Sequence, residues 1–175
     1  MTQPGTVIWF TGIAGSGKST IAGEVEQLLR ERGLPVENLD ADEVRANLSP
    51  NLGYTAEARD ENTKRLAWMA QTLSQHGVHV LIAAVSPLRA YRDRARQWCP
   101  HFFEVQVLCP LEVAQRRDPK GLYARAARGE VNDIAGLHQP YEEALNPEVV
   151  LHTDEVTVQE AAQAVLAQAE QRGYI

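Results

Sequence analysis

The segment Gly12–Ser19 reads Gly-Ile-Ala-Gly-Ser-Gly-Lys-Ser and matches the P-loop pattern of a glycine, four variable residues and Gly-Lys-Ser. Backbone N–H groups of such a loop cradle phosphate oxygens, and the following helix N-terminus adds partial positive charge. We expect the Lys18 ammonium to reach the β- and γ-phosphates of a nucleoside triphosphate and the Ser19 hydroxyl to bind Mg²⁺. The predicted nucleotide-binding residues are Gly12, Ile13, Ala14, Gly15, Ser16, Gly17, Lys18, Ser19 and Thr20.

A working P-loop needs a strand before it and a helix after it, and the sequence predicts both. Residues 7–11 are apolar and β-prone, and the apolar residues of 20–32 recur with helical spacing. The motif therefore falls at a strand-to-helix turn, where its chemistry requires it. The alternative is a glycine-rich turn that binds nothing.

Two carboxylates, Asp40 and Asp42, follow the next predicted strand, residues 35–39. Ligands of open α/β sheets gather at the carboxyl ends of the strands. Carboxylates at this place are suited to contact Mg²⁺ and to accept a proton from a substrate hydroxyl. Asp42 is alternatively the N-cap of a helix predicted from residue 43 to 48.

A long helix is predicted from Thr55 to about Gln75, and it places Arg59, Asn62 and Arg65 on one face. By pattern alone this face is a solvated surface stripe.

The next segment, residues 78–85, is nearly all apolar, as expected of a strand buried on both faces of a parallel sheet. Ser86 and Pro87 are interpreted as the N-cap and first residue of a helix that ends at Trp98. The arginines of this helix are predicted mostly to face solvent.

A fourth strand is predicted over residues 102–108 and a helix over 111–117, followed by a polar, basic segment. In a nucleotide-kinase-like fold this segment, about 117–130, is a lid that closes over the phosphates and excludes water. Its candidate cations are Arg117, Lys120, Arg125 and Arg128, with Gly121 and Gly129 as hinges. A solvated basic helix is the alternative for part of this set.

The remaining chain has an irregular loop over residues 130–147, a short strand at 149–152 and an amphipathic helix at 156–172. The alternation of strands and helices predicts an α/β P-loop fold with three layers, a five-stranded parallel sheet and a lid. We expect residues 1–175 to form one domain.

Composition narrows the classes of partner. The chain has 175 residues, 44% of them hydrophobic and 23% charged, with a net charge of −6, which argues against a nucleic-acid-binding surface. No targeting peptide and no membrane-spanning run is recognised, so a cytoplasmic enzyme is expected. The two cysteines, Cys99 and Cys109, are too few for a disulfide framework and are interpreted as ordinary apolar residues.

Several blocks together resemble the adenylylsulfate kinase (APS kinase) family of P-loop kinases over essentially the full length. They are Trp9–Gly12 into the P-loop, Leu39–Arg45, Leu52–Thr55, Arg59–Asn62, Ser86-Pro87, Arg117–Tyr123, Gly136–Glu142 and Asn146-Pro147. The family transfers the γ-phosphoryl group of ATP to the 3′-hydroxyl of adenylyl sulfate, giving 3′-phosphoadenylyl sulfate. The resemblance thus implies ATP and Mg²⁺ as cofactors and a role in sulfate activation.

The resemblance also implies roles for individual residues. Asp42 is the base on the 3′-hydroxyl with Asp40 beside it, Lys18 acts on the phosphates, and Ser86 matches an active-site serine that we interpret as a positioning residue. The implied substrate-binding residues, besides Asp42, are Arg45, Tyr54, Arg59, Asn62, Lys120 and Ile134, and Arg117 is assigned to ATP. The family is often dimeric, so the resemblance implies a homodimer and a functional link to ATP sulfurylase.

The sequence departs from the family pattern on the acceptor side. Ala41 and Glu43 replace a glycine and an asparagine, and Ile134 replaces a phenylalanine that clamps the substrate adenine. An aliphatic side chain loses aromatic stacking worth about 1 kcal/mol. A kinase of the same build with another nucleotide-like or small hydroxylated acceptor is therefore the alternative.

The sequence disfavours two other classes of nucleotide-binding protein. A GTP-dependent switch requires an Asn-Lys-x-Asp motif, which the sequence lacks. A nucleotide-binding module without chemistry is disfavoured by the intact set of Lys18, Ser19 and Asp42.

Overall fold

The computed structural model describes residues 3–175, and five parallel strands form its centre. The strands are β1 (Val7–Thr11), β2 (Val36–Asp40), β3 (His79–Ala83), β4 (Phe102–Leu108) and β5 (Val149–His152). Their order in the sheet is β2-β3-β1-β4-β5, and every neighbouring pair is parallel. The predicted five-stranded parallel sheet is confirmed.

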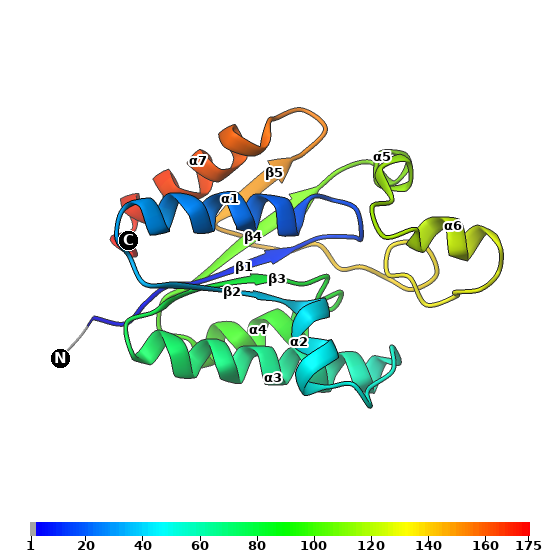
Figure 1. The fold of residues 1–175 in the computed structure, drawn as a ribbon, viewed down its shortest axis with the longest axis horizontal. Coiled ribbons are helices and arrows are strands. Elements are labelled where there is room, and N and C mark those ends of the chain that lie inside the picture. The colour runs from blue at the N-terminus through cyan, green and yellow to red at the C-terminus, as the bar shows by residue number, and fades with distance from the viewer. Residues whose placement is uncertain (1–2) are drawn as a thin grey trace.

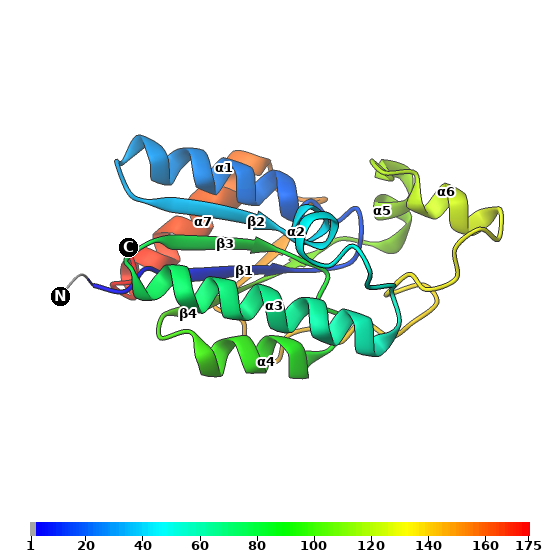
Figure 2. The same cartoon turned by 60° about the horizontal axis from the view of Figure 1, so that its bottom comes forward.

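Helices cover both faces of the sheet and make the predicted three layers (Figure 1). On one face lie α1 (Lys18–Glu31) and α7 (Val158–Gln171); on the other lie α2 (Ala41–Leu48), α3 (Ala56–Gln75) and α4 (Arg89–Trp98). Two short helices, α5 (Leu111–Arg117) and α6 (Leu122–Ala127), project beyond the carboxyl ends of the strands (Figure 2). The predicted lid segment therefore stands at the end of the sheet where the P-loop lies.

The alternation of side chains along β1 explains why this strand is central. Ile8 and Phe10 belong to the apolar core under α1 and α7, whereas Val7 and Trp9 belong to the core under α3. All five residues of β1, and all five of β3, are buried. Strands buried on both faces require apolar residues at nearly every position, which is the pattern seen in the sequence.

Strands β2 and β3 lie on one side of β1 in the sheet, and the chain then crosses from β3 to β4 on the other side of β1. Such a reversal opens a crevice at the carboxyl ends of the strands, where α/β proteins bind their ligands. The P-loop lies at this reversal. Residues 130–147, predicted to be irregular, form a loop with one isolated bridge between Ala135 and Gln139.

Across residues 3–175, no helix is both long and apolar enough to cross a lipid bilayer.

Candidate active site

The P-loop joins β1 to α1, and its glycines allow a close backbone approach. A Cβ atom at Gly12 would lie 2.3 Å from the carbonyl oxygen of Val107 in β4. Gly17 has a φ of 99° and is the N-cap of α1. Only glycine adopts such conformations without strain, so the loop packs against the sheet and still turns into the helix.

Lys18 is buried within the P-loop. Its ammonium donates a hydrogen bond of 2.7 Å to the carbonyl oxygen of Ile13 and lies 3.5 Å from Ser16 Oγ. Burial lowers the pKa of Lys18 from its ordinary 10.5 to about 8, although the nearby Asp42 carboxylate raises it. A phosphate bound beside the ammonium would favour its charged form, so anion binding and the charge of Lys18 support each other.

The two carboxylates after β2 have different tasks. Asp40 is the N-cap of α2, because its side chain accepts a hydrogen bond of 2.9 Å from the backbone N–H of Asp42. The alternative that Asp42 caps this helix is therefore wrong; the helix begins at Ala41, two residues earlier than predicted. The Asp42 carboxylate is left exposed and pairs with Lys120 of the lid.

Ser19 and Asp40 bring two oxygen donors together at the cavity wall. The Ser19 hydroxyl donates a hydrogen bond of 2.7 Å to Asp40 Oδ2. Mg²⁺ prefers oxygen ligands and is bound in kinases through one or two such side chains together with substrate phosphates and water. This pair therefore fits the metal predicted for Ser19.

The lid is docked onto the nucleotide side through its own small core. Tyr123 of α6 packs with Ala114 and Ile134, and the P-loop residues Ile13 and Ala14 contact this cluster. The Tyr123 hydroxyl donates a hydrogen bond of 2.8 Å to the carbonyl oxygen of Ala14. Burial raises the pKa of Tyr123 to about 12, so it keeps its proton at physiological pH.

The predicted lid cations are distributed over three environments. Lys120 and Arg125 line the cavity, and the hydrogen bond that Lys120 donates to the Asp42 carboxylate raises the pKa of Lys120. Arg117 instead donates hydrogen bonds to the hydroxyl and the carbonyl oxygen of Thr153. The Thr153 hydroxyl in turn donates a hydrogen bond to the carbonyl oxygen of Ser16. Arg128 forms a surface ion pair with Glu130.

One cavity of about 690 Å³ collects most of the predicted site residues. Those that line it are Ala14, Gly15, Gly17, Lys18, Ser19, Thr20, Asp40, Asp42, Tyr54, Arg59, Lys120 and Ile134. The P-loop, the end of β2, the start of α3, the lid and the irregular loop all contribute. The cavity thus places a phosphate-binding loop and an exposed carboxylate in one enclosure. Ile13 lines a separate groove of about 420 Å³.

The wall opposite the P-loop is built around Tyr54. The guanidinium groups of Arg45 and Arg59 lie 4.6 Å and 5.4 Å from the centre of the Tyr54 ring. Arg59 also donates hydrogen bonds of 2.9 Å to the carbonyl oxygen of Tyr54 and 2.7 Å to that of Asp133. The predicted surface stripe is therefore wrong for Arg59, which joins α3 to the irregular loop across the cavity; burial lowers its pKa.

Asn62 and Ser86 are buried behind the cavity wall. Within residues 3–175, no partner lies within hydrogen-bond distance of Asn62 Oδ1. Ser86 Oγ accepts a hydrogen bond of 3.1 Å from the Trp9 indole, and Ser86 has a φ of 42°. The prediction that Ser86 is an N-cap is wrong, because α4 begins at Arg89 and its N-cap is Leu88.

The prediction that the α4 arginines mostly face solvent is also wrong. Arg92 is 1% exposed and pairs with the buried Glu104 of β4 at 2.7 Å. Arg94 pairs with Asp60 of α3, and Arg96 pairs with Glu148 at 2.6 Å. The buried carboxylate of Glu104, 12 residues further along the chain on β4, draws Arg92 inward.

Sequence reasoning gave no role to Tyr123, Thr153 or Arg92. Tyr123 stood in the Arg117–Tyr123 block, which was the available signal. Thr153 followed the fifth strand, a place where ligands gather in α/β folds. Nothing in the local sequence distinguishes Arg92 from its neighbouring arginines.

A parallel sheet with a P-loop after β1, an acidic pair after β2 and a lid beyond β4 defines a P-loop kinase of the nucleotide-kinase-like class. Residues 4–152 match the family described as "Adenylylsulphate kinase", and the chain belongs to this family. A relative named adenylyl-sulfate kinase, from Halothermothrix orenii, is 46% identical over 173 residues, covering 99% of this chain and 94% of the relative.

A solved structure of the Mycobacterium tuberculosis APS kinase in complex with AMPPNP and APS has a TM-score of 0.91 and 41% identity. The match covers 95% of this chain and 98% of that chain. A Sorangium cellulosum protein named probable bifunctional SAT/APS kinase 2 is 44% identical over 171 residues, 98% of this chain and 29% of that protein. The family and the AMPPNP complex support nucleotide binding by this fold.

Proposed function

We propose that this protein is an adenylyl-sulfate kinase, which transfers the γ-phosphoryl group of ATP to the 3′-hydroxyl of adenylyl sulfate. One observation carries the proposal: Lys18 of the P-loop and the exposed carboxylate of Asp42 line the same cavity. Relatives that carry this name are about 45% identical to this protein over nearly the whole length of its chain. The product would be 3′-phosphoadenylyl sulfate, an activated sulfate donor.

On the nucleotide side, P-loop amides and Lys18 hold the phosphates of ATP. Residues 12–20 supply the loop and the first turn of α1, whose N-terminus favours negative charge. Arg117 is proposed to contact ATP, because it is anchored through Thr153 beside the P-loop. Ser19 and Asp40 would hold Mg²⁺, which neutralises phosphate charge when bound.

On the acceptor side, Asp42 accepts the proton of the 3′-hydroxyl while the oxygen attacks the γ-phosphorus. The new P–O bond forms as the bond to the β–γ bridging oxygen breaks, and ADP leaves with that electron pair. An acceptor hydroxyl that reaches Asp42 replaces Lys120 at this carboxylate. The Lys120 ammonium is then available to the negative charge of the transferring group.

The acceptor itself is proposed to lie between Tyr54 and Ile134, which line the cavity. Tyr54 would stack on the adenine, and Arg45, Arg59 and Asn62 would hold the ribose and the sulfate-phosphate end. The guanidinium groups beside Tyr54 place positive charge at this wall, which suits an anionic acceptor. Ser86 acts from behind the wall as a positioning residue.

We further propose that residues 1–175 act as one domain with the lid at about 117–130. Gly121 and Gly129 flank α6 with φ values of 63° and 74°, which suits them as hinges. A homodimer and a functional link to ATP sulfurylase are part of the same proposal. The expected cytoplasmic location stays a prediction.

The direct test is a coupled assay of purified protein with ATP, Mg²⁺ and adenylyl sulfate. We expect 3′-phosphoadenylyl sulfate at micromolar substrate and no transfer to adenosine 5′-phosphate at the same concentration, because the sulfate end is then missing. Absence of product from adenylyl sulfate would refute the proposal. A panel of hydroxylated acceptors in the same assay identifies any other substrate.

A further inference from the structure

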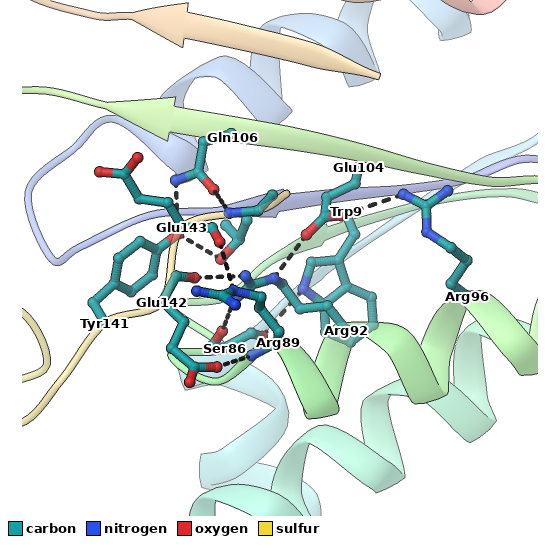
Figure 3. Close-up of polar contacts among 12 residues, drawn as sticks. Trp9, Ser86, Arg89, Arg92, Arg96, Glu104, Gln106, Tyr141, Glu142 and Glu143 are labelled. Carbon is teal, nitrogen blue, oxygen red and sulfur yellow. Dashed lines mark hydrogen bonds and ion pairs between the residues drawn. The ribbon is translucent and has the colours of Figure 1, made fainter. Parts of the chain in front are cut away.

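The irregular loop carries Ile134 at the cavity, but it is fastened to the fold some residues later, at Tyr141–Ala144 (Figure 3). The Tyr141 hydroxyl accepts a hydrogen bond of 2.9 Å from Gln106 Nε2 and lies 2.9 Å from Thr11 Oγ1. Thr11 Oγ1 donates its only proton to the carbonyl oxygen of Val85 at 2.8 Å. Tyr141 must therefore be the donor to Thr11.

This assignment gives a directed chain of hydrogen bonds from Gln106 through Tyr141 and Thr11 to Val85. The orientation of the Gln106 amide is fixed, because its Oε1 accepts a hydrogen bond of 2.7 Å from the backbone N–H of Ala144. Hydrogen bonds aligned in this way polarise and strengthen one another. The chain links β4, the irregular loop, the last residue of β1 before the P-loop, and a residue of the cavity wall.

Arg92 makes a second set of contacts between the same segments. Besides its ion pair with Glu104, it donates hydrogen bonds to the carbonyl oxygens of Ser86 and, at 2.6 Å, Glu142. These two residues directly follow Val85 and Tyr141 in the sequence. A single buried guanidinium therefore holds the turn after β3 and the loop against β4 (Figure 3).

Backbone contacts pair the turn and the loop further. The backbone N–H of Glu142 donates a hydrogen bond of 2.7 Å to the carbonyl oxygen of Pro87. The Glu142 carboxylate accepts a hydrogen bond of 2.8 Å from the backbone N–H of Arg89. By contrast, the hydrogen bonds of the tip at Ile134–Gln139 run mainly within the tip itself. The Tyr141–Ala144 anchor therefore acts together with the Arg59–Asp133 hydrogen bond and the packing of Ile134 against Tyr123 to set the position of the tip.

We propose that Tyr141 and Arg92 are positioning residues of the phosphoryl transfer, which align the acceptor wall with the P-loop without touching either substrate. The inference rests on the proposed function. The Thr11–Tyr141 contact joins the strand that leads into the P-loop to the loop that faces the acceptor, across 130 residues of sequence. Displacing bound reactants by about 1 Å can slow a reaction by about a hundredfold, so small shifts of this anchor are felt in turnover.

The test compares Tyr141→Phe and Arg92→Lys with Arg96→Lys as the matched control. Arg96 pairs with the same Glu104, at 3.2 Å, but its other partner is Glu148, so it leaves the turn and the loop alone. We expect kcat/KM for adenylyl sulfate to fall about tenfold in Tyr141→Phe and further in Arg92→Lys. The Kd of a non-hydrolysable ATP analogue should stay within twofold, and Arg96→Lys should change neither quantity.

Amide hydrogen exchange of peptides covering residues 84–88 and 133–144 provides a readout independent of activity. Both should exchange faster in Tyr141→Phe and in Arg92→Lys, but not in Arg96→Lys. If wild type transfers nothing to adenylyl sulfate, the proposed function fails, while exchange still decides on the anchor. Unchanged exchange, or Tyr141→Phe kinetics within twofold of wild type, would overturn the inference; because Tyr141→Phe removes one atom, it decides even if Arg92→Lys does not fold.

Discussion

The nucleotide side and the acceptor side of the cavity are built in different ways. The nucleotide side is one continuous stretch, residues 12–20, whose shape follows from its glycines and the start of α1. The acceptor side is assembled from separate segments through contacts such as Arg59 with Asp133 and Arg92 with Glu142, which span 74 and 50 residues. A local site tolerates distant changes, whereas an assembled site depends on residues that never meet the substrate.

The largest expected effect is a loss of turnover at Asp42 without a loss of nucleotide binding. Asp42→Asn removes the proposed base and should lower kcat about a thousandfold, the range of general-base catalysis. The Kd of an ATP analogue should stay within about threefold, because the P-loop is untouched. Steady-state kinetics and calorimetric titration measure the two quantities.

Asp93→Asn is the control for this charge change, since Asp93 is exposed on α4 and does not line the cavity. It should retain wild-type kinetics. Undiminished turnover in Asp42→Asn would remove this carboxylate from the proposed mechanism.

The second effect concerns Lys18 on the nucleotide side of the cavity. Lys18→Met should lower turnover about a hundredfold, the cost of losing one group that stabilises transition-state charge. At pH 7 it should also stabilise the free protein. The pKa of Lys18 falls from 10.5 to about 8, and each pKa unit corresponds to 1.36 kcal/mol, so the buried charge costs about 3 kcal/mol.

The sign of this effect follows from proton binding. Between pH 8 and 10.5 the unfolded chain holds the Lys18 proton more tightly than the folded protein, so wild-type stability rises with pH through this window. The advantage of Lys18→Met should therefore shrink above pH 8, as measured by denaturant unfolding. Lys64→Met, on an exposed lysine, is the control; a stability difference that is constant with pH would contradict the expectation.

A smaller effect tests the acceptor side alone. Arg59→Lys keeps the charge but cannot form both bonds to the carbonyl oxygens of Tyr54 and Asp133. We expect KM for adenylyl sulfate to rise about tenfold, the equivalent of about 1.4 kcal/mol of lost hydrogen bonding, with KM for ATP unchanged. Arg30→Lys on the exposed face of α1 is the matched control, and a parallel rise of both KM values would show that the two sides are not separable.

The smallest effect concerns Tyr123, where the lid meets the P-loop. Tyr123→Phe loses the hydrogen bond to Ala14 and should reduce the free energy of unfolding by about 1 kcal/mol. KM for ATP should rise a few-fold while KM for the acceptor stays constant. Tyr91→Phe loses a comparable bond to Ala56 and should lose stability without changing KM for ATP. A change confined to KM for the acceptor would show that the Tyr123–Ala14 contact belongs to the acceptor side of the cavity.

Much of the fold was predictable, because the signals are local. Apolar runs predicted the five strands, helical spacing predicted α1, α3 and α7, and glycines marked the P-loop. The family was recognisable from blocks of short motifs. These patterns work because a backbone conformation depends mainly on a residue and its near neighbours.

Two errors concern the residue at which a helix begins. Asp42 is a reasonable N-cap in sequence, but Asp40 caps α2 because the strand ends at Asp40 and the helix starts directly after it. Ser86 and Pro87 match a helix start, yet Trp9 and Arg92 bind Ser86 and the helix begins at Arg89. At Asp40 the deciding contact lies two residues away, whereas at Ser86 the Trp9 indole, 77 residues away in sequence, takes the hydroxyl.

The sequence by itself determined the phosphate-binding loop, the order of strands and helices and the family. The tertiary structure alone decided which carboxylate is free to act, which arginines are buried and how the acceptor wall is fastened. The physical reason is that hydrogen bonds between residues 50 to 130 positions apart form only where the register of the sheet brings donor and acceptor within reach. No local pattern of residues specifies that register.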